Sequence, residues 1–399
     1  MESYLLDWAN LLLRWLHVIT AIAWVGSSFY FVWLDNHLIK PRSPDLLEKG
    51  VDGALWAVHG GGFYNPQKYV VAPKKIHTEL HWFYWESYST WLSGFALFTV
   101  LYLWNAGSFL VDRSVFDWSP LAAGAAALGF LAAFWLVYDA ICRTLGQRDN
   151  GDRLVGIAVV VAVVLASWLA CRLFAGRAAF LLVGAMIATA MSANVFFWII
   201  PGQRKVVKAM LAGEPVDPVH GRRGKQRSVH NTYFTLPVLA AMLSNHYGWL
   251  YQGSHNWIVL VLLMLAGALI RHFFVARHKA HLKGVQPPWG YAAAGVATLL
   301  ALVVLLAPAP QPVVADNTPP VVFSQVEAVV QQRCVMCHNA QLQNKNVALH
   351  TPELIRQHAL QMYQQVVVLR QMPFNNATQI TEAERQIVRR WHEAGAPGP

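Results

Sequence analysis

Eight long apolar segments constrain the fold of this chain more than any other feature. They span residues 11–34, 82–104, 120–142, 154–175, 178–200, 229–250, 256–276 and 289–307. A membrane-spanning helix needs about 20 mostly apolar residues. Only 13 % of the residues are charged, against about 25 % in soluble domains. The sequence therefore predicts an all-α fold, with a polytopic bundle of eight transmembrane helices within residues 1–307.

Lysines and arginines give this bundle a predicted orientation. The loops 35–81, 143–153, 201–228 and 277–288 hold 19 of them, whereas the alternate loops hold three. Because cationic residues accumulate in cytoplasmic loops, we expect a multi-pass membrane protein with both termini on the side away from the cytoplasm. The net charge of +10 is then an orientation signal. It calls for a lipid bilayer and for no nucleic acid partner.

A second domain follows the last apolar segment. Five prolines within residues 308–320 predict a stiff, extended linker. Residues 321–399 have the composition of a small soluble domain. Within them, Thr381 and Glu384 match a helix capping box ahead of an apolar helix face. The predicted domains are thus a membrane domain (1–307), a linker on the outer side of the membrane (308–320) and a small soluble domain (321–399).

A C-x-x-C-H motif, formed by Cys334, Cys337 and His338, predicts that residues 321–399 are a small class I cytochrome c domain. This spacing attaches a c-type haem covalently, and the histidine ligates its iron. The alternatives are a redox dithiol and a structural zinc site. Zinc would need two further ligands, and the domain offers only scattered histidines, namely His350, His358 and His392.

A methionine is the expected second axial ligand of the iron, because a thioether raises the haem potential. Met372 precedes a proline, which makes a helix there unfavourable and predicts a loop. Met362 falls in an apparent helix, and Met336 lies inside the motif. We therefore predict that His338 and Met372 bind the haem c iron.

Polar residues inside the apolar segments form an outer and an inner group. At the outer level, His17 and His246 lie at similar depths, with Arg14 and Asn245 close to them in sequence. Histidines on different helices can ligate a b-type haem in a bundle. This pair is therefore predicted to hold one such group, although a single histidine at a helix end is often only interfacial.

The inner group contains the candidate catalytic residues. They are Glu86, Arg271, His272 and His81, because a carboxylate, a guanidinium and imidazoles can bind and deprotonate a small substrate. Cys142 and Cys171 are expected to be core residues. Further polar residues near this face are His77, Asn194, His230, Asn231, Thr232, Tyr233 and a glycine loop at 59–64.

Two family resemblances extend these predictions. Residues 15–26 resemble the first helix of HemJ-type protoporphyrinogen oxidases, in which the residue matching His17 ligates haem. The eight spans, the loop at 59–64, the Trp82–Glu86 segment and the fused C-x-x-C-H domain resemble bacterial membrane-bound urate hydroxylases of the PuuD family. That resemblance implies oxidation of urate to 5-hydroxyisourate in purine degradation, with electrons passing to cytochrome c. It also implies a location in the bacterial inner membrane, with both termini on the periplasmic side.

The expected mechanism combines both groups of residues. Arg271 and the glycine loop would bind the urate anion, and Glu86 or a histidine would remove a proton. Electrons would pass through one or more haem b groups to haem c, and then to a soluble cytochrome c or a terminal oxidase. The inner and outer groups lie most of a bilayer apart, so either a second haem bridges them or the substrate site lies deeper.

Three other functions fit the residues less well. The first is a quinol or other respiratory oxidoreductase that feeds the tethered cytochrome. The second is a simple electron carrier, for which a single anchoring span would be enough. The third is a transporter regulated by redox state. Without the resemblance, the residues define only a membrane oxidoreductase with a tethered c-type cytochrome.

Overall fold

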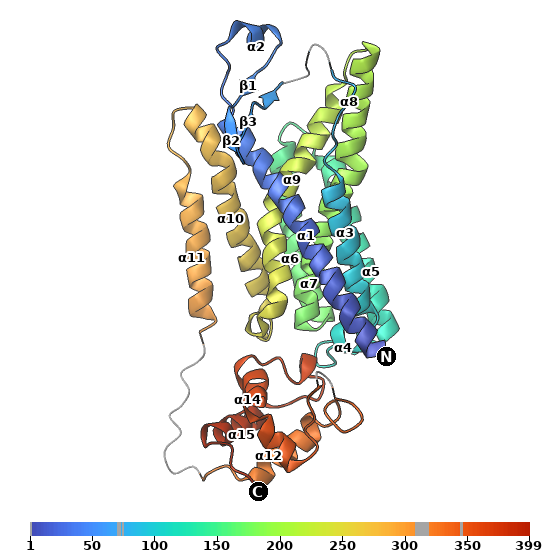
Figure 1. Cartoon of the computed structure of the whole chain (residues 1–399), viewed down its shortest axis with the longest axis vertical. Coiled ribbons are helices and arrows are strands. Elements are labelled where there is room, and N and C mark those ends of the chain that lie inside the picture. Colours follow the sequence, from blue (N-terminus) through green and yellow to red (C-terminus); the bar gives the residue numbers. More distant parts are fainter. Residues whose placement is uncertain (1, 70–72, 74–75, 308–318, 344–345) are drawn as a thin grey trace.

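The chain forms a long helical bundle with a smaller helical segment below one end of it (Figure 1). The structure, a computed structural model, describes residues 2–69, 73, 76–307, 319–343 and 346–399. Most of the predicted linker, residues 308–318, lies outside the described residues. We call the bundle end beside the C-terminal segment the near end, and the opposite end the far end.

Long helices build the bundle, and the chain enters it at the near end. In chain order they are α1 (Glu2–His37), α2 (Pro44–Glu48), α3 (Trp85–Phe98), α4 (Ala106–Phe109), α5 (Pro120–Leu145), α6 (Gly151–Leu173), α7 (Gly176–Ala193), α8 (Ile200–Ala212), α9 (Pro218–Leu243), α10 (Asn256–Leu282) and α11 (Trp289–Leu305). A π-helical turn, Thr99–Leu103, extends α3, and another, Asn194–Ile199, joins α7 to α8.

All eight predicted segments overlap helices, but they differ in how well they could cross a membrane. Five are long and apolar enough, over Tyr4–His37, Pro120–Leu145, Gly151–Leu173, Gly176–Ala212 and Asn256–Arg277. The other three are α3, α9 and α11. Polar aromatic and hydroxyl side chains fill α3, the first half of α9 is strongly basic, and α11 has 17 residues. Length and apolarity alone therefore support five spans among the described residues, not eight.

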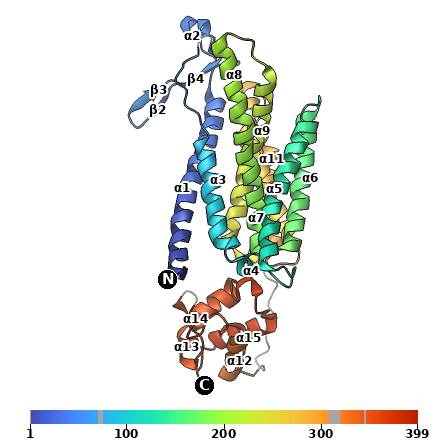
Figure 2. The same ribbon diagram turned by 90° about the vertical axis from the view of Figure 1, so that its right-hand side faces the viewer.

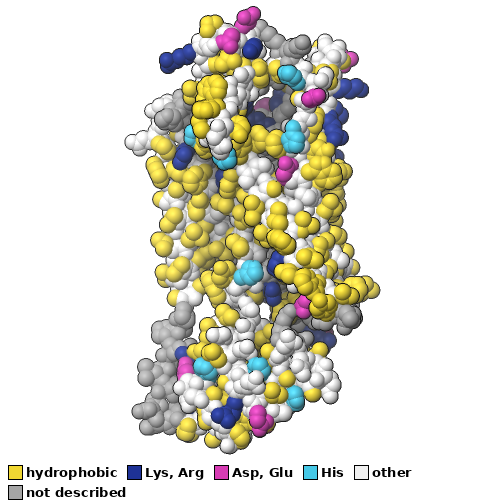
Figure 3. Space-filling view, in the orientation of Figure 1, with side chains coloured by type: hydrophobic (Ala, Val, Ile, Leu, Met, Phe, Trp, Pro, Cys, Tyr) yellow, Lys and Arg dark blue, Asp and Glu magenta, His cyan; other side chains and the backbone are white. Residues whose placement is uncertain are grey.

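Helix α7 lies at the centre of the bundle core. Phe180, Leu182 and Met186 are fully buried, and α7 packs against α5, α6 and α9. Cys142 and Cys171 are buried as well, as predicted for core residues. In contrast, many apolar side chains of α1 are exposed. In Figure 3, hydrophobic side chains cover the visible length of the bundle, and lysines and arginines gather near the far end. This surface is compatible with a membrane location.

Two small antiparallel sheets lie at the far end. The strands are β1 (Gly53–Ala54), β2 (Ala57–His59), β3 (Gly62–Tyr64) and β4 (Gln67–Lys68), with β1 paired to β4 and β2 to β3. Figure 2 shows the β2–β3 hairpin projecting from the bundle. Gly60 and Gly61 have φ of 58° and 80°, which the tight hairpin turn requires and which glycine adopts freely. The glycine loop at 59–64 therefore has a local structural reason.

The C-terminal segment is a compact set of helices. They are α12 (Phe323–Arg333), α13 (Pro352–Gln357), α14 (Ala359–Met362) and α15 (Glu382–Glu393). The predicted capping box is present, since Thr381 and Glu384 bond each other's backbone N–H groups. Helix α15 packs on α12 through Trp391, which is fully buried near Phe323. An ion pair between Arg333 and Glu384 at 2.9 Å joins the same two helices.

Candidate functional site

A cavity of about 2260 Å³ connects the interior of the bundle with the C-terminal segment. Helices α1, α3, α7 and α9 form its walls in the bundle. It extends from Ser28 and Asn231 towards the far end to Cys334, Cys337 and His338 in the C-terminal segment. A cavity of this size exceeds the usual 300–1,000 Å³ of a small-molecule pocket. It therefore has room for more than one bound group.

His17 lies on the cavity wall between α1 and α3. Its Nδ1 is 3.1 Å from the carbonyl oxygen of Thr90 and 3.2 Å from Ser93 Oγ. When Nδ1 donates to that carbonyl, Nε2 carries no proton and can ligate a metal. A Cβ at Gly94 would come within 2.7 Å of the His17 ring. The glycine therefore allows the imidazole to pack directly on the backbone of α3.

His246 lies on the wall of the same cavity, in the 3₁₀ turn Ser244–His246. The preceding residue fixes this turn, because Asn245 Oδ1 accepts from Tyr102 OH at 2.9 Å and from Arg177 Nε at 3.1 Å. Arg14 and Arg177 also line the cavity. The near end thus combines two imidazoles with two guanidinium groups, a set that suits a haem and its two propionates.

The C-x-x-C-H motif follows α12 directly and faces the cavity. His338 Nδ1 lies 3.0 Å from the carbonyl oxygen of Val347, which again leaves Nε2 available for a metal. Burial, with smaller contributions from Cys337 and Glu384, raises the pKa of the Cys334 thiol to about 12. A redox dithiol needs a lowered thiol pKa. This environment therefore disfavours that alternative.

Met372 occupies a loop, as predicted, and lines the cavity. Arg385 stabilises the loop by donating hydrogen bonds to the carbonyl oxygens of Met372 and Val366. Met362 also lines the cavity but is buried at the end of α14, whereas Met336 is exposed. Among the described residues, no group of three histidine, cysteine or acidic side chains could hold a metal ion, which gives the zinc alternative no support.

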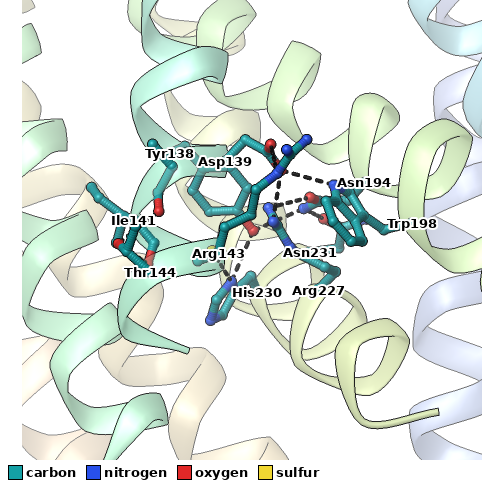
Figure 4. A network of polar contacts seen from close by, with 12 residues as sticks. Tyr138, Asp139, Ile141, Arg143, Thr144, Asn194, Trp198, Arg227, His230 and Asn231 are labelled. Carbon is teal, nitrogen blue, oxygen red and sulfur yellow. Dashed lines mark hydrogen bonds and ion pairs between the residues drawn. The ribbon is translucent and has the colours of Figure 1, made fainter. Parts of the chain in front are cut away.

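A buried polar network lies towards the far end (Figure 4). At its centre, Arg227 Nη2 pairs with Asp139 Oδ1 at 2.7 Å, and the two side chains are only 3 % and 8 % exposed. The same carboxylate accepts from Trp198 Nε1 at 2.8 Å and pairs with the exposed Arg143 at 2.6 Å. The charges of this centre are therefore mutually satisfied.

The network reaches the cavity through two asparagines. Arg227 Nη1 donates to Asn194 Oδ1 at 3.1 Å, and Asn194 Nδ2 donates to Asn231 Oδ1 and to Tyr138 OH, both at 2.9 Å. Tyr138 OH in turn lies 2.8 Å from His230 Nδ1. Asn231 lines the cavity, so its amide is held in one orientation by groups beyond the cavity wall.

The four predicted catalytic residues do not form one cluster. Arg271 and His272 lie against α9, where Arg271 Nε donates to the Thr232 carbonyl at 3.3 Å and His272 Nδ1 is 2.7 Å from Tyr233 OH. His81 packs on Phe83. No hydrogen bond or ion pair joins Glu86 or His81 to Arg271 or His272 within the described ranges. None of the four is on the wall of the cavity.

Arg271 nevertheless lies close behind that wall. Its guanidinium covers the ring of Phe29 at 4.2 Å and bonds Thr232. These two residues are the chain neighbours of the cavity-lining Ser28 and Asn231. The side chain is 5 % exposed, and its Nη2 has no hydrogen-bond partner among the described residues. A buried cation in this state favours an anion nearby.

Sequence reasoning missed the ion pair at the centre of the network. Asp139 is the sole charged residue in the apolar segment 120–142, and an ionisable residue inside a span is a functional signal by default. Arg227 was counted only as part of a cytoplasmic loop. Its position one turn before Asn231, at the start of the segment 229–250, could have suggested a pairing.

Comparison with known proteins adds one finding. The family model described as Urate oxidase N-terminal matches residues 3–307, which is more than half of the chain and includes the whole bundle. No curated protein and no solved structure matches the sequence. The chain therefore belongs to the Urate oxidase N-terminal family, which points to an oxidoreductase with a urate-related function.

Proposed function

We propose that this protein oxidises urate to 5-hydroxyisourate and delivers the electrons to a c-type haem on its C-terminal segment. Urate and one water molecule together lose two electrons and two protons, and the oxygen atom of the water stays on the product. The observation that carries this proposal is the single cavity whose wall includes His17 and His246 at the near end and the C-x-x-C-H motif beyond it. A protein of the bacterial inner membrane with eight spans and a periplasmic C-terminal segment fits this arrangement.

Four residues would hold the covalent haem. Cys334 and Cys337 would form its thioethers, and His338 and Met372 would bind the iron. The histidine is oriented for this by its bond to Val347, and the loop of Met372 is held by Arg385. Haem c supplies one-electron acceptance, and it would pass electrons to a soluble cytochrome c or a terminal oxidase.

His17 and His246 would hold a b-type haem inside the bundle. The support is the free Nε2 of His17, set by the Thr90 carbonyl, and the presence of both imidazoles on one cavity wall. Arg14 and Arg177 would neutralise the propionates. Because the cavity continues inwards, one such group would shorten the gap between the substrate and the C-terminal segment.

Urate would bind at the inner end of the cavity, beside Asn231 and Thr235. The buried guanidinium of Arg271 behind the wall would attract the anion, with His272 next to it. The amide of Asn231 has one donor and one acceptor position beyond those used by the protein, which suits the edge of a purine. Glu86 and His81 lie off the cavity wall, so their proposed acid–base role rests on the sequence alone.

The deciding experiment is anaerobic addition of urate to the purified full-length protein. We expect the c-haem absorption to change to that of the reduced form, and the variant His17→Ala to lose the b-haem signal while keeping the c-haem signal. Xanthine is the matched control ligand, because it is a related purine that this reaction cannot convert to 5-hydroxyisourate. It should not reduce the c haem. Reduction by a quinol but not by urate would refute the proposal and favour the respiratory alternative.

A further inference from the structure

The loop Arg370–Asn376 follows the π-helical turn Tyr363–Val368 and contains Met372. It contacts the bundle through side chains and backbone. We propose that this docking loop holds the C-terminal segment with its C-x-x-C-H face turned towards the bundle, and that the segment must be released to serve an external acceptor. The role of the contact rests on the proposed function, whereas the contact itself does not.

The docking loop places one aromatic side chain against two groups of the bundle. The Phe374 ring lies 4.8 Å from the ring of Phe109 on α4, at an angle of 57°. The guanidinium of Arg177 lies 5.3 Å from the centre of the Phe374 ring. Stacked and cation–π contacts of this kind stabilise an interface beyond the area they bury.

Hydrogen bonds on both sides of Phe374 fix the position of the loop. Asn375 Nδ2 donates to the backbone carbonyl oxygens of Ser108 and Phe109 at the end of α4. At the start of the loop, Gln252 of the bundle donates to the carbonyl oxygen of Arg370. Bonds from amide side chains to backbone carbonyls specify position more than they add affinity.

Arg177 connects this contact to the near end of the cavity. The same guanidinium that covers Phe374 donates to Asn245, the neighbour of His246. Met372 lies two residues before Phe374, and Arg385 fixes its carbonyl. Met372, the predicted ligand of the haem c iron, is therefore linked to His246, the predicted ligand in the bundle. The link runs through the contacts of Phe374, Arg177 and Asn245.

Docking also covers the face that an outside partner would need. Cys334, Cys337 and His338 line the cavity shared with the bundle, so a soluble acceptor cannot approach them from that direction. The side-chain contacts described above come from a single short loop. Small, partly polar contacts between domains of one chain are typically reversible, and the covalent tether keeps the local concentration high enough for renewed docking.

Thiol crosslinking in the full-length, haem-loaded protein tests the docked geometry without any substrate. The pair Ser108→Cys and Asn375→Cys should crosslink with a short bismaleimide, because the two residues are in contact. The native Cys142 and Cys171 are buried and should not react. The matched control is Ser108→Cys with Ser324→Cys. Ser324 lies near the start of α12, about 15 Å along that helix from the C-x-x-C-H motif, and should not crosslink.

Two variants test the contacts individually. Asn375 has φ of 48°, so Asn375→Gly removes the amide without adding backbone strain, and Phe374→Ala removes the ring. The readout is crosslinking between Ser108→Cys and Gln371→Cys, two positions that line the cavity beside the loop. Each variant should lower its yield, by about tenfold for the double variant. In the same proteins, urate should reduce the c haem more slowly, whereas ascorbate should reduce it at the rate of the unaltered protein.

The outcomes separate the two proposals. Equal crosslinking of the 108/375 and 108/324 pairs, or a yield that neither variant lowers, would overturn the docking proposal. Specific crosslinking together with no reduction by urate would leave docking intact and refute the proposed function. If the crosslinked pair passes electrons to a soluble cytochrome c as fast as the open form does, release is not required.

Discussion

Replacement of Asp139 by alanine would leave the Arg227 guanidinium buried without its counter-ion. Both side chains are almost completely enclosed, at 8 % and 3 % exposed. Removing one partner of a buried ion pair costs roughly 3–5 kcal/mol, because the remaining charge stays desolvated. The loss of the acceptor for Trp198 Nε1 adds about 1 kcal/mol. We therefore expect Asp139→Ala to lower the free energy of unfolding by about 4–6 kcal/mol.

The same carboxylate provides its own control. Arg143 pairs with Asp139 from the surface, and its side chain is 62 % exposed, so Arg143→Ala should cost only about 0–1 kcal/mol. The double variant Asp139→Leu/Arg227→Leu removes both buried charges. It should regain most of the loss, because apolar side chains of similar volume can replace a buried pair at little cost.

Denaturant titration of the detergent-solubilised protein measures these differences. The midpoint and slope of the transition give the free energy of unfolding for each variant. The reasoning is wrong if Asp139→Ala and Arg143→Ala differ by less than about 1 kcal/mol. It is equally wrong if the double leucine variant is less stable than Asp139→Ala. The unpaired charge of Arg227 would then not be the cause of the lost stability.

Three further predictions concern the candidate site and the C-terminal segment. Glu86→Gln should lower urate turnover at least tenfold with an unchanged c-haem spectrum; normal turnover would make Glu86 structural. Met372→Ala should lower the c-haem potential in a redox titration, whereas the control variant Met362→Leu should leave the potential unchanged. Although burial opposes it, bonds from Thr381 and Arg333 hold the pKa of Glu384 below its ordinary 4.5. That stabilisation is complete above pH 4.5 and is lost as the pH falls through the lowered pKa. Hydrogen exchange of α15 should therefore accelerate in acid, and Glu384→Gln should abolish this dependence.

The sequence predicts helices well where the signal is local. Apolar runs such as 154–175 become α6, and the pattern Thr381-x-x-Glu384 becomes a capping box, since each depends on a few neighbouring residues. The segments 82–104 and 229–250 are harder. Their polar side chains lower the apolar signal, although they line a cavity and a network inside the bundle.

Contacts between distant residues were beyond prediction from one sequence. Asp139 and Arg227 are 88 positions apart, and Asn375 meets Ser108 across 267. Depth along a helix suggested that His17 and His246 share one level, and both line the cavity. Depth along a helix does not show on which face of that helix a residue lies. For that reason Glu86 and Arg271 were grouped, although no contact in the described structure joins them.

The length of the cavity has a consequence for the membrane as an electrical insulator. In the bilayer location proposed above, a bundle with a cavity from its near end as far as Asn231 cannot rely on its full height to keep protons and ions from crossing. The barrier is concentrated in the short stretch of protein beyond that residue, where Asn194, Arg227 and Asp139 fill the interior with paired groups. The permeability of the whole protein then depends on a few hydrogen bonds near one face.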